Sequence, residues 1–137
     1  MFSSEKALVN RFVRALKSDN TPWGTVQVSR EFPYNRGKTD VIAVDDRQTV
    51  IAFEAKLTAW RDALQQAYRN TCFAHASYVV LPKDTATLAG RCLAEFEKRG
   101  VGLCYIDGPD VVILHTPSPS IPIEPWLACK AVSQARK

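Results

Sequence analysis

The sequence has no long hydrophobic run, no closely paired cysteines and no repeated segment. Because its apolar stretches fall far short of the roughly 20 residues that span a bilayer, we expect no membrane-spanning helix. The N-terminal segment carries an early acid and no continuous apolar core, unlike a secretory signal. The spacing of the four cysteines argues against a structural zinc site and favours buried free thiols over disulfides. We expect a cytoplasmic protein with these free cysteines: Cys72, Cys92, Cys104 and Cys129.

Several common catalytic motifs are also missing. There is no Gly-x-Ser-x-Gly motif, and the two histidines, His75 and His115, stand alone, so nothing indicates a nucleophilic hydrolase. Gly37-Lys38-Thr39 resembles the end of a phosphate-binding P-loop, but Phe32 occupies the position of the required earlier glycine. A strand rather than a helix is predicted to follow, so the helix N-terminal amides that hold phosphate would be absent. We exclude nucleotide binding by that route.

What remains has the composition of one ordinary globular domain. The chain has 137 residues, of which 46% are hydrophobic and 23% are charged. A domain of this length buries enough surface to fold without a metal or a disulfide. The net charge of +4 is compatible with a phosphate-rich partner but does not establish one.

Periodicity predicts a mixed α/β domain in which helices flank a central sheet. The core is expected over residues 4–116, followed by a proline-rich segment and a C-terminal helix within 117–137. Helices are predicted over residues 4–17, from residue 59 onwards, over 84–99 with Asp84 as N-cap and Gly100 as stop, and over 126–137. Strands are predicted over residues 25–32, 39–44, 50–57, 77–81, 101–106 and 111–115, with a loop or turn at 33–37.

The second and third strands carry the most informative polar residues. Strand alternation places Glu54 and Lys56 on one face, while Ile51, Phe53 and Ala55 share the apolar opposite face. If Val44 pairs with Val50 in a hairpin, Asp40 falls opposite Glu54, whereas a shift of one residue would separate them. Two adjacent carboxylates repel each other unless a cation or a proton lies between them. Oxygen ligands of this kind suit Mg²⁺ or Mn²⁺.

Asp40, thirteen intervening residues and Glu54-Ala55-Lys56 resemble the signature of the PD-(D/E)XK nuclease superfamily, which has a restriction-endonuclease-like fold. The resemblance covers about residues 5–82. It implies that Asp40 and Glu54 hold Mg²⁺ with help from the Ala55 carbonyl, and that Lys56 assists the attacking water or the scissile phosphate. Glu5 resembles an acid that some members place on the first helix.

The sequence also departs from the family pattern. Thr39 stands where the signature has proline, and the glutamine motif of some branches is not met. Gln66 is preferred over Gln65 as the glutamine that faces the site. The predicted function is a Mg²⁺-dependent nuclease acting on DNA. The alternative is a catalytically silent module of a repair or defence assembly that binds nucleic acid or protein, and a homodimer or a partner protein fits either function. The basic residues expected to contact a nucleic-acid backbone are Arg30, Arg36, Lys38, Arg61 and Arg69.

Overall fold

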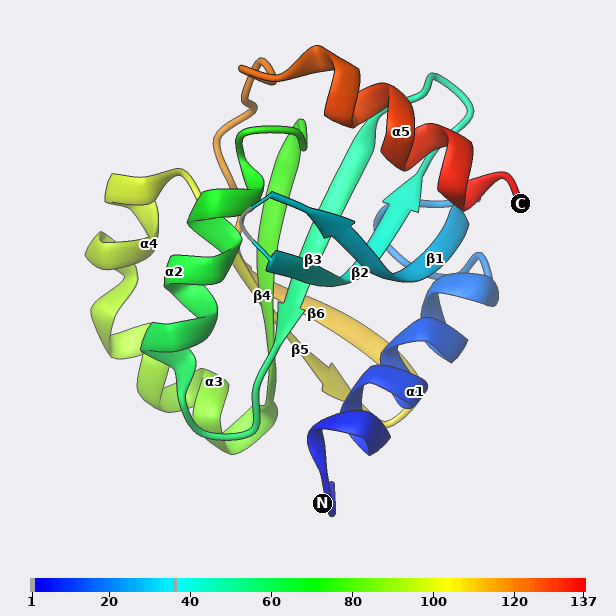
Figure 1. Ribbon diagram of the computed structural model, residues 1–137. Helices are drawn as coiled ribbons and strands as arrows, with labels where there is room; N and C mark the ends of the chain where they lie inside the picture. Colours follow the sequence, from blue (N-terminus) through cyan, green and yellow to red (C-terminus); the bar gives the residue numbers. More distant parts are fainter. Residues whose placement is uncertain (1, 36) are drawn as a thin grey trace.

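The computed structural model describes residues 2–35 and 37–137. Figure 1 shows the arrangement of its helices and strands, with α2, α3 and α4 grouped on the left and α5 at the top. The elements in chain order are α1 (Glu5–Lys17), β1 (Gln27–Tyr34), β2 (Gly37–Val44), β3 (Val50–Ala55), α2 (Trp60–Asn70), β4 (Ala76–Pro82), α3 (Lys83–Ala89), a 3₁₀ turn (Gly90–Cys92), α4 (Leu93–Arg99), β5 (Gly102–Asp107), β6 (Asp110–His115) and α5 (Pro125–Ala135).

The strands form one six-stranded mixed sheet in the order β1-β2-β3-β4-β5-β6. β1, β2 and β3 are antiparallel neighbours, β3, β4 and β5 are parallel, and β6 returns antiparallel to β5. The two parallel connections contain helices, as parallel strands require a long crossover. The predicted α/β class with a helix-flanked central sheet is confirmed.

Both faces of the sheet are covered. Ile51 and Phe53 lie in one core cluster with Leu8 and Phe12 of α1, and Phe53 and Phe12 meet edge to face at 4.7 Å between ring centroids. On the opposite face, α5 covers the first part of β3, and α2, α3 and α4 cover β4 and β5. β3 is therefore buried along its whole length, including the face that carries Glu54.

Several predicted element boundaries were wrong, and the strand expected over residues 50–57 ends at Ala55. The helix expected over residues 84–99 is split into α3 and α4 by the turn at Gly90–Cys92, and glycine is a poor residue for a helix interior. Asp84 is not the N-cap: α3 follows Pro82 and has no side-chain cap. The loop expected at residues 33–37 is shorter, because Pro33 and Tyr34 belong to β1, an edge strand that tolerates proline. Gly100 does end α4, with a left-handed φ of 69°.

Individual side chains also differ from the expectations. Cys72 and Cys104 are buried and take part in no disulfide, as expected, and burial raises the pKa of the Cys104 thiol. Cys92 is half-buried and Cys129 is exposed, so the expectation was wrong for Cys129. Tyr68 of α2 is 53% exposed. None of the helices within the described residues has the length and apolarity needed to cross a membrane.

Candidate functional site

The β2–β3 hairpin brings Asp40 to the end of β3. Val44 pairs with Val50 and Val41 pairs with Phe53, which is the register expected from the sequence. Beyond Val41, the pairing continues through a side chain: Asp40 Oδ2 accepts a hydrogen bond from the Ala55 backbone N–H at 2.9 Å. This bond holds one oxygen of Asp40 against the residue that follows Glu54.

Glu54 lies at the centre of a buried polar network. Its side chain is 1% exposed, and its Oε2 accepts a hydrogen bond from Asn70 Nδ2 of α2 at 2.8 Å. Asn70 Oδ1 in turn accepts from the Tyr34 hydroxyl at 2.7 Å and from Thr39 Oγ1 at 3.0 Å. Because two hydroxyl donors occupy the amide oxygen, the amide nitrogen must face Glu54. Asn70 therefore fixes the position of the Glu54 carboxyl group.

The environment of Glu54 strongly disfavours a negative charge. Burial raises the pKa of this carboxyl from 4.5 to about 8, and the neighbouring Asp40 carboxylate contributes to the rise in the same direction. The Asn70 hydrogen bond lowers the pKa but does not offset these effects. At neutral pH Glu54 therefore carries a proton, which a bound cation would displace.

Lys56 follows directly after β3 and is tied to the first helix. Its Nζ lies 3.8 Å from Glu5 Oε1, and its backbone N–H donates to the Val80 carbonyl at 3.3 Å. The Lys56 side chain is 26% exposed, so its ammonium group remains accessible from solvent. Glu5 is the first residue of α1, which Ser4 caps with its side chain. Two residues separated by more than a third of the chain length are thus brought together.

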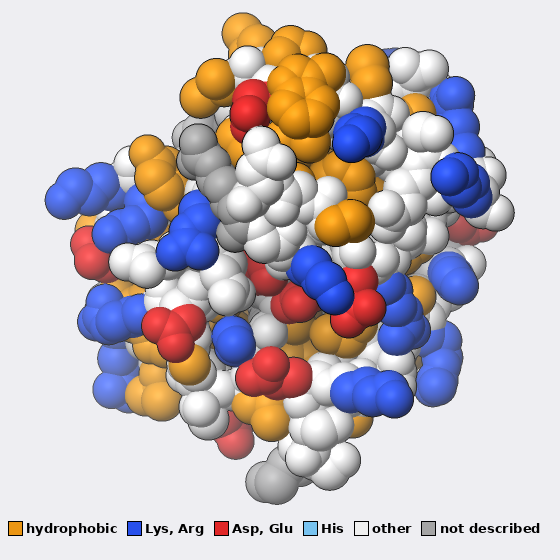
Figure 2. All heavy atoms as spheres, in the orientation of Figure 1, with side chains coloured by type: hydrophobic (Ala, Val, Ile, Leu, Met, Phe, Trp, Pro, Cys, Tyr) orange, Lys and Arg blue, Asp and Glu red, His pale blue; other side chains and the backbone are white. Residues whose placement is uncertain are grey.

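A hollow of about 480 Å³ opens beside Asp40. Glu31 lies in its wall with a left-handed φ of 53°, between the pairs Arg30–Val41 and Phe32–Thr39. Figure 2 shows acidic side chains gathered near the middle of the molecular face, with lysine and arginine side chains around them. The hollow is lined by Glu5, Lys6, Val9, Arg30, Glu31, Asp40 and Ala55.

Other predicted residues lie in different surroundings. Gln66 is half-buried on α2, one helical turn before Asn70, and forms no hydrogen bond with the carboxyl pair within the described part of the chain, while Gln65 is exposed. Arg61 stacks over Trp60 at 4.2 Å and lies 3.9 Å from Glu95, so α2 and α4 contacts already occupy it. Lys38 and Arg69 are exposed. Arg30 donates to Asn10 Oδ1. Arg36 lies outside the described residues.

Three residues near the site were not predicted from the sequence. Asn70 lies three positions after Ala67, on the buried face of α2. A polar residue at a position where the helical period predicts burial could have been recognised from the sequence. Thr39 is fully buried. Its β-branched side chain suits a strand in any case, so the sequence did not indicate that its hydroxyl group contacts the site. Glu31 gave no signal, because its left-handed backbone conformation follows from tertiary structure.

The donor set fits a single hard cation better than a large metal cluster. Asp40 and Glu54 supply oxygen atoms, and Mg²⁺ is commonly held by one or two carboxylates with water completing its coordination. Across residues 2–35 and 37–137, no group of three or more His, Cys, Asp or Glu side chains is placed to hold a metal ion. Any cation here would depend on the carboxyl pair, backbone oxygen and water.

Comparison with known proteins shows the fold alone. No protein-family model matches the chain, and no curated protein matches it. A solved structure, the SPO1766 protein of unknown function from Silicibacter pomeroyi, is similar with a TM-score of 0.66 and 16% sequence identity. The alignment covers 99% of this chain and 86% of that one. The similarity therefore extends over the α/β domain as a whole.

Proposed function

We propose that this protein is a Mg²⁺-dependent nuclease that hydrolyses phosphodiester bonds, with DNA as its expected substrate. The observation that carries the proposal is the carboxyl pair Asp40–Glu54, held by separate N–H donors and followed by Lys56. Burial, together with the neighbouring Asp40 carboxylate, raises the pKa of Glu54, and a bound cation would favour its charged form. The resemblance to the PD-(D/E)XK signature supports the same assignment.

Each residue has a distinct task in this proposal. Asp40 and Glu54 would hold Mg²⁺, with the Ala55 carbonyl as a further oxygen. Bound Mg²⁺ polarises a phosphate oxygen and lowers the pKa of water. Lys56 places a compact positive charge beside the hollow, where it stabilises negative charge on phosphate oxygens. Asn70 and the Ala55 N–H orient the two carboxyl groups, and Glu5 orients the Lys56 ammonium.

The alternative function is a silent module that binds nucleic acid or protein without cleaving it. One observation favours it: Glu54 is 1% exposed, so a cation has little direct access to this carboxyl group. The two functions differ in their response to metal. A nuclease of the proposed kind gains thermal stability from Mg²⁺ or Mn²⁺, whereas a silent module that binds no metal does not.

Cleavage of duplex, single-stranded and branched DNA and of RNA, with Mg²⁺ or Mn²⁺, tests the proposal. We expect the wild type to cut and the isosteric variants Asp40→Asn and Glu54→Gln to lose at least about 100-fold in rate, with Lys56→Gln similarly impaired, since each removes a charge used in the reaction. Matched controls are Glu97→Gln, an exposed acid, and Lys83→Gln, a lysine that is likewise ion-paired, to Asp107 at 3.7 Å.

Activity that survives all three site substitutions would place the reaction elsewhere. Wild-type protein that binds a substrate without cutting it, and shows no metal effect on melting temperature, would establish the silent alternative. Loss of activity in the controls as well would point to a general effect of charge rather than to the site.

A further inference from the structure

Residues 116–124, which we call the strap, cross the surface between β6 and α5 and are fixed at several points. Pro117 is buried against Gly102, where an added Cβ would lie 2.8 Å from Pro117 Cδ. Ser120 donates its N–H to the His75 carbonyl at 2.9 Å and its hydroxyl to the Ala74 carbonyl at 2.8 Å. The Glu124 N–H donates to the Cys72 carbonyl at 2.9 Å.

This fixed segment displays large apolar side chains to solvent. Ile121 is 91% exposed and Ile123 is 82% exposed, and Trp126, at the start of α5, is 51% exposed. Half of the exposed large hydrophobic residues among the described positions thus lie within six residues of one another. A large apolar side chain left in water forgoes the favourable free energy of burial. Apolar residues held outward in this way are typical of a surface that another molecule covers.

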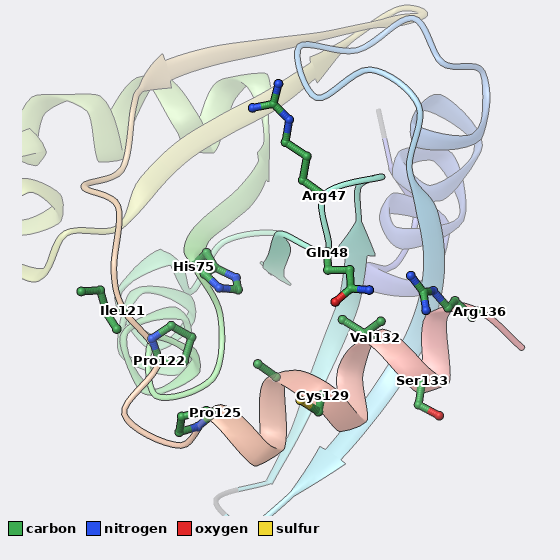
Figure 3. Close-up of a pocket in the computed structure, with 11 residues that line it drawn as sticks. Arg47, Gln48, His75, Ile121, Pro122, Pro125, Cys129, Val132, Ser133 and Arg136 are labelled. Carbon is green, nitrogen blue, oxygen red and sulfur yellow. The ribbon is translucent and has the colours of Figure 1, made fainter.

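A groove of about 670 Å³ runs beside the strap. Figure 3 shows the strap and α5 along its sides, with the His75 and Gln48 side chains turned toward the space between them. His75 Nδ1 accepts the Val50 N–H at 3.0 Å, so in the neutral ring the hydrogen is on Nε2 and can be donated to a ligand. The groove lies at the first residue of β3, whereas the candidate nuclease site lies at its last.

The face of α5 along the groove has a regular pattern. Ala128, Val132 and Arg136 follow one another at four-residue spacing and line the groove, while Leu127 and Ala131 are buried in the core. The small side chains allow close approach of another chain. α5 thus buries one face in the core, while Ala128 and Val132 are half-buried beside it and leave part of their apolar surface open to the groove.

The lining of the groove carries positive charge, although Glu124 lies on the strap beside it. Arg47 and Arg136 line it, and no aspartate or glutamate does. Asp45 and Asp46 border another hollow beside Arg136, but no ion pair joins either arginine to a carboxylate within the described residues. Lys130, whose Nζ lies 5.7 Å from the Trp126 ring centroid, extends the positive charge along α5.

We propose that the strap and groove bind an acidic amphipathic segment of a partner protein. Its apolar side chains cover Ile121, Ile123 and Trp126, and its carboxylates face Arg47 and Arg136. A second copy of this chain is a poorer occupant, because a symmetric interface would bring the same arginines and lysine toward one another. Partner binding here is independent of the proposed nuclease activity.

Selection from a phage-displayed library of random 12-residue peptides, with the full-length protein as target, tests this assignment. Enriched peptides should combine aspartate or glutamate with large apolar residues. Synthetic copies of them should bind at least about tenfold more weakly to Ile123→Ser and to Arg136→Glu than to wild type. Leu88→Ser, which removes an apolar residue that is 54% exposed, and Lys98→Glu, which reverses an exposed lysine, should bind them as wild type does.

Three results would overturn the assignment. The first is no enrichment, or peptides without acidic residues. The second is equal weakening by the control variants, which places binding elsewhere. The third is a dimer in sedimentation velocity that Ile123→Ser dissociates, which makes a second copy the occupant. None of these results depends on whether the protein cuts nucleic acid.

Discussion

Glu54 is the buried titratable group at the centre of the candidate site. Its carboxyl is buried beside Asp40, and its pKa is raised from 4.5 to about 8. Between these values the folded protein binds a proton that the unfolded chain has released, so the protein is stabilised fully below pH 4.5 and loses that stabilisation as pH rises through 8. The buried acid thus makes the metal-free protein less stable in mildly alkaline solution.

We predict that the free energy of unfolding of the metal-free protein falls between pH 5 and pH 8, by at most about 1.4 kcal/mol per pH unit from this group. Urea unfolding followed by circular dichroism at several pH values measures the slope. Glu54→Gln, which cannot ionise, should flatten the profile. Glu97→Gln should leave it unchanged, and a slope that persists in Glu54→Gln would assign the pH dependence to other groups.

Asn70 makes a separate prediction, because its hydrogen bond favours the charged form of Glu54. Asn70→Leu should raise the pKa of Glu54 further and weaken Mg²⁺ binding. It should also destabilise the protein by about 2–4 kcal/mol, since the Thr39 and Tyr34 hydroxyls each lose an acceptor. Carbon-13 NMR of the Glu54 carboxyl and calorimetric titration with Mg²⁺ measure the first two effects.

Thr39→Val is the matched variant for Asn70. It removes one donor to the Asn70 oxygen but leaves the Tyr34 hydroxyl bonded to the same atom. The Glu54 pKa should therefore rise less than in Asn70→Leu. Equal shifts in the two variants would show that packing, rather than the Asn70 amide, controls the carboxyl group.

At the scale of elements, the contact between β5 and the strap depends on a glycine. A Cβ at Gly102 would lie 2.7 Å from Tyr78 Cδ2 and 2.8 Å from Pro117 Cδ, so both side chains or the backbone between them must shift. We predict that Gly102→Ala destabilises the protein by about 1–3 kcal/mol. Gly90→Ala is the control, because its nearest new neighbour is Leu114 at 3.9 Å. Thermal unfolding distinguishes them, and equal melting temperatures would contradict the predicted crowding.

The sequence predicted some elements better than others for identifiable reasons. The β2–β3 hairpin has the register considered first, with Val44 paired to Val50, although the sequence left a shift of one residue open. The split of α3 from α4 was missed, because one continuous apolar pattern spans both helices. The Asp40–Glu54 pair followed from strand alternation, but its link to Asn70 required the packing of α2 on β3. The spacing of residues within one element does not predict a hydrogen bond such as that between Asn70 and Glu54, which lie on different elements.

For the whole molecule, the distribution of positive charge matters more than the net charge of +4. Under the proposed function, exposed cations near the site bind phosphates and release counterions, so affinity for DNA falls as salt rises. Arg61 is already engaged by Trp60 and Glu95, whereas Arg69 and Lys38 are exposed. The three cations should therefore contribute unequally to binding.

We predict that Arg69→Gln and Lys38→Gln each reduce the slope of log affinity against log salt by about 0.9 for duplex DNA, the value for one phosphate contact. Arg61→Gln should change it less, because freeing Arg61 for a phosphate requires breaking its contacts with Trp60 and Glu95. Lys130→Gln, on the α5 face beside the strap, serves as the control for the same loss of charge. Fluorescence anisotropy in Ca²⁺, which we expect to support binding without cleavage, measures the slopes. Equal slopes in all four variants would mean that DNA responds only to the overall charge, and the site would then lack the local phosphate contacts that positioned cleavage requires.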